Sequence, residues 1–468
     1  MPPHSPTTDP DPDPDPDTAL SRRQLLRTRI HTTAMIWAVF LCGWNDGTLG
    51  PLIPRIQNVY SLGYIIVALL FVFQSLGSIT GAFMTITLTP KLGFGKMLLL
   101  APLFQVLGYS LQSAAPPYPA FAFASFMNGI GVSILDAQAN GYVASIKRHG
   151  EERMGYTQAA YGAGLFAAPL VSTQFAHLPR WSFHYLVSLG ITLSNIVVLA
   201  VLFRGKTQQE CLAQLGQTAA PTTGIEDEDK TGPGQQRKQS PLRQLFALKA
   251  MHLMALFLFV HVGVAVANGG WTVTYMINVR GGGESAGYIV AGYSGGAVLG
   301  RIILIPLNKF IGENRVVYIY TIIAIGSLFL PLLSQLPLLT LPPPPSLQLI
   351  VYLLPSLTGG AIAIAFGGLM SGPLYPLALN RAARLFPPHL LTPAMGWMAA
   401  MATVGGAIIP FIAGAISQSA GIESLQPVII AGMGVMLGLW TLVPKRIDAE
   451  PEREQREGDV EKEEIKSE

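Results

Sequence analysis

The sequence contains many runs of apolar residues, each close to the 20 residues that one helix needs to cross about 30 Å of hydrocarbon. Only 12% of its 468 residues are charged, whereas soluble domains average about 25%. The mean hydropathy is +0.42. These values exclude most soluble cytosolic proteins, and the sequence predicts an all-α membrane protein that crosses the bilayer many times.

The apolar runs predict about twelve transmembrane helices in two sets of six. The first set lies near residues 32–54, 62–89, 96–115, 118–146, 154–177 and 183–203. The second set lies near residues 250–278, 286–307, 316–336, 347–376, 392–417 and 424–443. Some of these spans are long enough to require tilting in the bilayer.

Polar segments divide the chain further. We expect a disordered N-terminal tail over residues 1–31, a six-helix half over 32–203, a disordered loop over 204–249, a second half over 250–443 and an acidic tail over 444–468. Most basic residues beside the spans lie on the side that carries both chain ends and this loop. The positive-inside rule therefore predicts cytoplasmic termini, in a multi-pass protein of the plasma membrane or an internal membrane.

Two repeated motifs relate the halves. Each half has a basic loop after its second helix, and a glycine followed five residues later by a proline in its fifth helix. The loops run from Lys91 to Lys96 and from Lys309 to Arg315, and the pairs are Gly164 with Pro169 and Gly405 with Pro410. Their corresponding places predict two pseudo-symmetric halves, related by an axis along the membrane normal.

Asp46 and Asp136 are the acidic residues that fall inside predicted spans. A charged carboxylate at the bilayer centre costs about 2.5 to 3.5 kcal/mol on insertion scales, so it needs a function or a partner. From the helical rise, both lie roughly 15 to 20 Å from the cytoplasmic helix ends and share one layer. Either residue is a candidate proton carrier; the alternative is a structural hydrogen bond between helices.

Further polar residues recur at helical spacing around these acids. Asn140 follows Asp136 by one turn, and Gln158 and Tyr161 form a similar pair in the fifth helix. Asn268, Trp271 and Tyr275 form one stripe of the seventh helix, which would either stack on a sugar ring or pack between helices. Arg301 lies deep in the eighth helix, where a cation needs a carboxylate or carbonyl partner.

Over residues 32 to 443 the chain resembles the major facilitator superfamily, and within it the fucose-permease-like branch with its fungal members. The resembling segments are Asn45–Asp46 with Pro54, Leu135–Asn140, Gly269–Tyr275, Gly300–Arg301 and Gly372–Pro376, together with the two basic loops. The resemblance implies that Asp46 and Asp136 serve substrate and proton. Two positions depart from the resemblance. The branch commonly has an acid at the place of Ala265, and it often has an Asn near the place of Tyr161.

The sequence and this resemblance together predict a secondary active transporter that moves a small polar solute, with monosaccharides the indicated class, by alternating access and proton coupling. The expected solute-binding residues are Asn45, Asp46, Asp136, Asn140, Gln158, Tyr161, Asn268, Trp271 and Tyr275, and the expected gating residues are Lys91, Lys96, Arg301, Lys309, Glu313 and Arg315.

Other functions compete with this one. An uncoupled facilitator and a non-transporting sensor on the same fold are the alternatives that stay open. A membrane-embedded enzyme is not expected, because no Gly-x-Gly-Asp pattern surrounds either aspartate and no phosphate-binding loop occurs. The expected partners are the solute, a proton and the lipid bilayer; we expect a monomer without nucleic acid, cofactor or metal.

Overall fold

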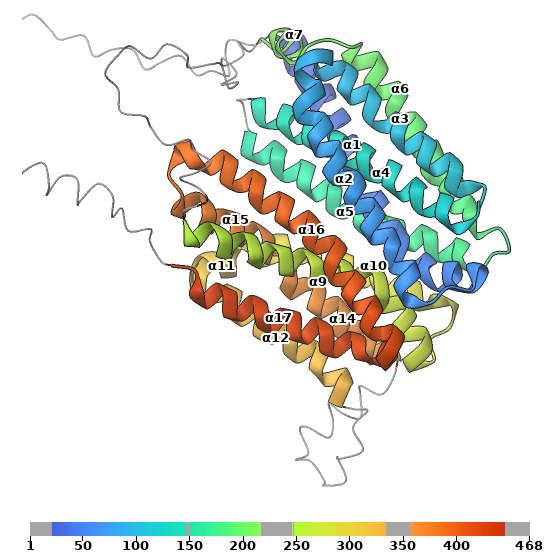
Figure 1. Ribbon diagram of the computed structural model, residues 1–468. Helices are drawn as coiled ribbons and strands as arrows, with labels where there is room; N and C mark the ends of the chain where they lie inside the picture. Colours follow the sequence, from blue (N-terminus) through green and yellow to red (C-terminus); the bar gives the residue numbers. More distant parts are fainter. Residues whose placement is uncertain (1–20, 147–149, 217–245, 247, 334–356, 445–468) are drawn as a thin grey trace, which may run out of the picture.

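The computed structural model of the protein describes residues 21–146, 150–216, 246, 248–333 and 357–444. Within these ranges the chain is almost wholly helical and contains no strand. Figure 1 shows two helical bundles side by side, one from the first half of the chain in blue to green and one from the second half in yellow to red. The all-helical fold predicted from the apolar runs is confirmed.

The first bundle contains six long helices. They are α1 (Arg22–Tyr60), α2 (Tyr64–Leu92), α3 (Phe94–Ser113), α4 (Tyr118–Ser145), α5 (Gly150–Ala176) and α6 (His184–Phe203), with a short 3-10 turn η1 (Trp181–Phe183) before α6. A seven-residue helix, α7 (Gln208–Gln214), follows α6.

The second bundle repeats this order with two broken helices. Its helices are α9 (Lys249–Arg280), α10 (Gly287–Ile303), α11 (Ile305–Ile311), α12 (Glu313–Leu333), α14 (Leu357–Ser371), α15 (Leu374–Leu385), α16 (Pro388–Ala420) and α17 (Leu425–Leu442), with the 3-10 turns η2 (Glu284–Ala286) and η3 (Ile422–Ser424). The pairs α10–α11 and α14–α15 each correspond to one predicted span. The described ranges therefore contain twelve helical segments that match the predicted spans, six in each half.

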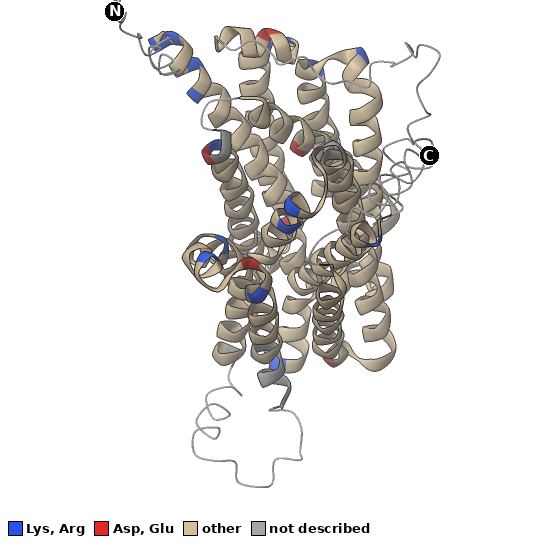
Figure 2. Cartoon of the chain, turned by 90° about the vertical axis from the view of Figure 1, so that its left-hand side faces the viewer, with Lys and Arg blue, Asp and Glu red and all other residues tan. Residues whose placement is uncertain are grey.

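Membrane-crossing character is strong in most of these helices. Among the described residues, eight helical segments are long and apolar enough to cross a membrane, and the α10–α11 pair, bent by 54°, counts as a ninth. The remaining spans are α1, α5 and α12; α1 and α5 carry many of the polar side chains described below. Figure 2 shows long stretches of helix without a charged residue.

Two boundaries differ from the sequence prediction. The first helix begins at Arg22 rather than near residue 32, because Ser21 and Gln24 form a capping box at its start. Residues 22–31 are therefore helical and not part of a disordered tail. The tenth span runs on to Leu385, beyond the expected end near residue 376, and breaks at Gly372 and Pro373. Its expected start, 347–356, lies outside the described residues.

The central loop is also partly ordered. Thr207 and Glu210 form a capping box that starts α7, which packs Cys211 and Leu212 into the core of the first bundle. Burial raises the pKa of the Cys211 thiol to about 11, so this thiol stays protonated. The prediction of a disordered loop over 204–249 is therefore wrong for residues 208–214, while residues 217–245 lie outside the described ranges.

Glycines bring equivalent helices together in the two halves. A Cβ atom on Gly164 of α5 would lie 2.0 Å from the carbonyl oxygen of Phe40 on α1. A Cβ atom on Gly405 of α16 would lie 1.9 Å from the carbonyl oxygen of Phe259 on α9. Only glycine permits such close backbone approach. The repeated Gly and Pro motif thus reflects the same helix contact in both halves.

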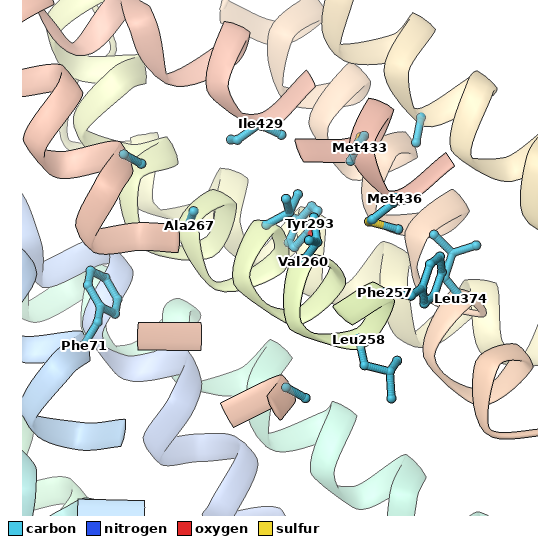
Figure 3. Close-up of a cluster of buried hydrophobic side chains, with 14 of the residues drawn as sticks. Phe71, Phe257, Leu258, Val260, Ala267, Tyr293, Leu374, Ile429, Met433 and Met436 are labelled. Carbon is cyan, nitrogen blue, oxygen red and sulfur yellow. The ribbon is translucent and has the colours of Figure 1, made fainter. Parts of the chain in front are cut away.

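The buried core of the second bundle is apolar. Figure 3 shows side chains from α9, α10, α15 and α17 gathered there, among them Val260, Tyr293, Leu374 and Met433. Phe71 of the first bundle lies at the margin of this group (Figure 3) and packs against Trp271. The first bundle carries Asp46 on α1 and Asp136 on α4.

Side-chain contacts join the two halves at one end of the helices. We call the end where α1 begins and α17 ends the terminal end, and the other the opposite end. At the opposite end the backbone N–H of Tyr64 donates to the Gln418 side chain (2.7 Å), the Asn278 amide donates to the Tyr64 hydroxyl (3.2 Å), and Gln174 contacts Tyr288. These contacts join α2 to α16 and α9, and α5 to α10.

Candidate functional site

Asp46 is the hydrogen-bonding centre of the first bundle. One carboxylate oxygen, Oδ1, accepts from the Gln74 amide on α2 (2.9 Å) and from the neighbouring Asn45 amide (3.2 Å). The other, Oδ2, accepts from the Tyr161 hydroxyl on α5 (2.7 Å). Three helices therefore converge on this carboxylate.

The side chain of Asp46 is nevertheless exposed. It lies near the middle of the 39-residue helix α1, and its donors come from two neighbouring helices, so the exposure does not arise at a helix end. Tyr161 beside it is half-buried, and Gln158 one turn earlier on α5 is exposed. An accessible carboxylate that accepts hydrogen bonds from three helices is a group that a small polar molecule could reach.

Asp136 carries the second group of polar side chains. Its carboxylate accepts from the Asn140 amide on the next turn of α4 (2.8 Å), as the spacing predicts. The Asn140 side-chain oxygen accepts in turn from the Gln158 amide on α5 (3.3 Å). Asp136 lies close enough to Asp46 for the two carboxylates to interact electrostatically. Helix α5 thus connects the two acids, through Tyr161 and Gln158.

Arg301 of α10 is a residue of the second bundle that lies beside this site. Its Nε donates to the carbonyl oxygen of Gly372 (3.2 Å), at the break between α14 and α15. Of the two partners that sequence analysis allowed, the carbonyl is the one observed among the described residues. The guanidinium also lies near the hydroxyl groups of Tyr161, Tyr375 and Tyr293. It therefore lies beside the polar site, and not at the ends of the helices with the basic loops.

Asn45 has a supporting position. It is buried, and its side-chain oxygen accepts from the Tyr109 hydroxyl on α3 (2.9 Å) while its amide donates to Asp46. The geometry therefore orients the Asp46 carboxylate and leaves Asn45 little accessible surface for a solute. Tyr109 and Gln74 were missed by sequence analysis, although a single glutamine in the apolar second span is a signal that could have drawn attention to Gln74.

The residues of the stripe on α9 are buried. Trp271 is fully buried, its Nε1 donates to the carbonyl oxygen of Pro410 on α16 (3.0 Å), and its ring packs against Tyr64 and Phe71. Tyr275 is also buried. In this conformation these contacts favour packing, the second of the two interpretations, and a role of the two residues in solute binding stays a prediction. Asn268 is buried too and accepts from the Thr272 hydroxyl (2.8 Å).

A conservative change at Trp271 tests the packing interpretation. Trp271→Phe removes the hydrogen bond to Pro410 and leaves a cavity, so it is expected to destabilise the protein by about 1–3 kcal/mol while solute affinity stays unchanged. Thermal unfolding and solute binding of the purified variant measure both. Unchanged thermal stability together with lost solute binding would instead support a role of Trp271 in solute binding.

The expected gating residues lie mainly at the terminal end. Glu313 at the start of α12 forms an ion pair with Arg384 on α15 (2.5 Å). Next to it, Arg381 donates to Asn314 (2.9 Å) and to the carbonyl oxygen of Val443 (2.8 Å). The remaining basic residues of the two loops are exposed, namely Lys91, Lys96, Lys309 and Arg315. These contacts tie the helices of the second bundle together, and their role in gating stays a prediction.

Two relatives align with most of the chain. One is "Bypass of stop codon protein 6" of Saccharomyces cerevisiae, 26% identical over 441 residues that cover 92% of this chain and 84% of the relative. The other is a "Glucose/galactose transporter" of Brucella abortus, 24% identical over 438 residues that cover 87% of this chain and 93% of the relative.

Solved structures share the fold, and a family description fits the sequence. A D-xylose-proton symporter superposes with a TM-score of 0.69 at 12% identity, over 89% of this chain and 98% of the other. The fucose:proton symporter of E. coli superposes with a TM-score of 0.54 at 17% identity, over 90% of this chain and all of the other. The sequence matches the Major Facilitator Superfamily over residues 35–362 and 346–467. The chain therefore belongs to the Major Facilitator Superfamily.

Proposed function

We propose that this protein is a proton-coupled transporter of a small polar solute, of the monosaccharide class, and that Asp46 and Asp136 form its central site. The observation that carries the proposal is Asp46, an accessible carboxylate in the middle of a helix with donors from α1, α2 and α5. Ionisable groups at this depth serve substrates and ions far more often than they serve packing.

The chemistry of the site supports a sugar-like solute. Carboxylate and amide groups of Asp46, Gln158 and Asn140 offer both acceptors and donors, which is what vicinal hydroxyls require. Arg301 and Tyr375 would extend the same surface from the second bundle. A relative named for glucose and galactose, and the similar folds of symporters for xylose and fucose, agree with this class.

The hydrogen bonds of Asp46 suggest how a proton could be linked to movement. An ionised carboxylate accepts only, whereas a protonated one donates through the oxygen that carries the proton. Protonation at Oδ2 would thus change its bond with Tyr161, and at Oδ1 its bond with Gln74. These bonds join α1 to α5 and α2, so proton uptake would alter the contacts of three helices at once.

Two observations bear on the side of the membrane from which the site is accessible. The positive-inside rule predicts that the terminal end is cytoplasmic. Contacts such as those of Tyr64 with Gln418 and Asn278 hold the halves together at the opposite end. We therefore propose that the site of Asp46 is open to the cytoplasm in this conformation. Rocking of the halves about the central site would expose it to the other side.

An uncoupled facilitator remains the second candidate. The observation that favours it is the full set of donors around Asp46, which also suits a carboxylate that stays ionised and only binds the solute or orients helices. Ala265 on α9, where the resembling branch commonly has an acid, agrees with it. A proton-conducting ionophore separates the candidates, because it should abolish accumulation by a symporter and spare equilibration by a facilitator.

A thermal-shift screen tests solute binding directly. The purified protein is mixed with glucose, galactose, fucose and xylose, and a ligand at 100 times its Kd should stabilise the folded state by about 2.7 kcal/mol. Asp46→Asn should lose the shift, while Glu284→Gln, a matched acid-to-amide change in η2 at the opposite end, should keep it. An equal shift in wild type and Asp46→Asn would remove Asp46 from the solute site.

A further inference from the structure

An open groove lies on the outer surface of the first bundle, between α1 and α6. It has a volume of about 550 Å³, and the residues that line it include Arg29, Thr33 and Trp37 on α1 and Ser194, Val198 and Leu202 on α6. On each helix these residues recur every fourth position, so each set forms one continuous stripe. Ala34, a small buried side chain, also lines the groove and leaves room in it.

The groove has a charged mouth and an apolar interior. Arg29 belongs to the first turns of α1 and Leu202 to the last turn of α6, so both lie at the terminal end. Trp37 and Ser194 lie eight residues further along their helices, about 12 Å deeper. The groove therefore runs from the membrane interface towards the hydrocarbon core.

Its surroundings face lipid. Leu193, Val197 and Val201 on α6 are large apolar side chains with 46%, 62% and 57% of their surface exposed, as expected for a helix face in contact with acyl chains. Arg29 is exposed and forms no hydrogen bond or ion pair with another described residue. A cation without a partner in the described part of the chain, beside an apolar groove, matches the charged headgroup and the acyl chains of a phospholipid.

We propose that the α1–α6 groove is a binding site for one anionic phospholipid, with an acyl chain between the two stripes and the headgroup phosphate on Arg29. The other arginines at the start of α1, Arg22, Arg23 and Arg27, are exposed and add positive potential around the headgroup. Arg204, two positions after Leu202, does the same from the end of α6. Zwitterionic lipids would enter the same groove with lower affinity, because their headgroups carry no net charge. This inference depends on membrane embedding and is independent of the solute.

Native mass spectrometry of the full chain in detergent tests the site, with dioleoyl phosphatidylglycerol and dioleoyl phosphatidylcholine as probes. Near a membrane surface one cation contributes about fivefold in affinity for anionic lipid. Wild type should therefore prefer phosphatidylglycerol by about that factor or more. Arg29→Gln should lose about fivefold in phosphatidylglycerol affinity and clearly less in phosphatidylcholine affinity, because choline already offsets the charge of that phosphate. Retained phosphatidylcholine binding shows that the variant is folded.

Two further variants separate the groove from general surface charge. Ser194→Trp, at an exposed position, fills the deep part of the groove and should weaken binding of both lipids. Lys309→Gln removes an exposed cation at the same end of the other half, outside the groove, and should leave the preference intact. The proposal is overturned if wild type shows no preference, if Arg29→Gln keeps it, or if Lys309→Gln reduces it as much as Arg29→Gln does.

Discussion

Asp46→Asn is expected to abolish proton-driven accumulation of the solute in reconstituted vesicles. The variant keeps the size of the side chain but removes its charge and its ability to carry a proton. Hydrogen bonds to a charged group contribute roughly 1.5–3 kcal/mol each, so the loss of one such bond to the solute would lower affinity by about 10- to 100-fold. The bonds from Gln74 and Tyr161 would weaken as well.

Three further variants show whether loss of the ionisable group at position 46 causes that result. Asp46→Glu keeps the ionisable group and should retain part of the activity, because the longer side chain displaces the carboxylate but does not remove it. Asp136→Asn should reduce accumulation too, since Asp136 interacts with Asp46 and bonds to Asn140. Glu284→Gln should behave as wild type. Normal accumulation by Asp46→Asn would show that the proton is carried elsewhere.

The second large effect is expected at two glycines, each of which allows a close contact between two helices of its own half. Gly164→Ala and Gly405→Ala each place a methyl group about 2 Å from a backbone carbonyl oxygen, of Phe40 and Phe259 respectively, where no side chain can rotate away. Overpacking of this kind costs about 1–3 kcal/mol for each site. The double variant, with distant and independent sites, should lose the sum and show a strongly lowered Tm or no stable fold.

Gly434→Ala on α17 is the matched control. A Cβ atom there meets no other atom within 4 Å, and the residue is exposed. Because alanine is favoured over glycine in a helix by about 0.5–1 kcal/mol, this variant should be slightly more stable than wild type. If Gly164→Ala, Gly405→Ala and Gly434→Ala had the same effect on thermal unfolding, the close helix contacts would not be what stabilises the two bundles.

The helical fold was predictable because its causes are local. Apolar runs of membrane-spanning length locate the helices, and the paired Gly and Pro motifs relate α5 to α16. Details that depend on short polar signals were missed. Ser21 with Gln24, and Thr207 with Glu210, are capping boxes visible in the sequence, but they start helices within segments whose overall composition resembles disordered chain.

The site was predictable only within single helices. The four-residue spacing of Asp136 and Asn140 predicted that their side chains lie close together, since both belong to one helix. The bond from Gln74 to Asp46 joins residues 28 positions apart, and no pattern within either helix specifies it. Trp271 was ambiguous for a similar reason, because the neighbours that decide between packing and stacking, such as Phe71, belong to other helices.

Solute uptake by proteoliposomes tests the central claim most directly. Wild-type protein is reconstituted without a gradient or with an inward proton gradient, and radiolabelled glucose, galactose, fucose and xylose are supplied separately. The account predicts that at least one sugar accumulates above its external concentration only when the gradient is present, and that Asp46→Asn does not accumulate it. Equilibration of a sugar without accumulation would contradict proton coupling, and absence of transport for all four would contradict the monosaccharide class.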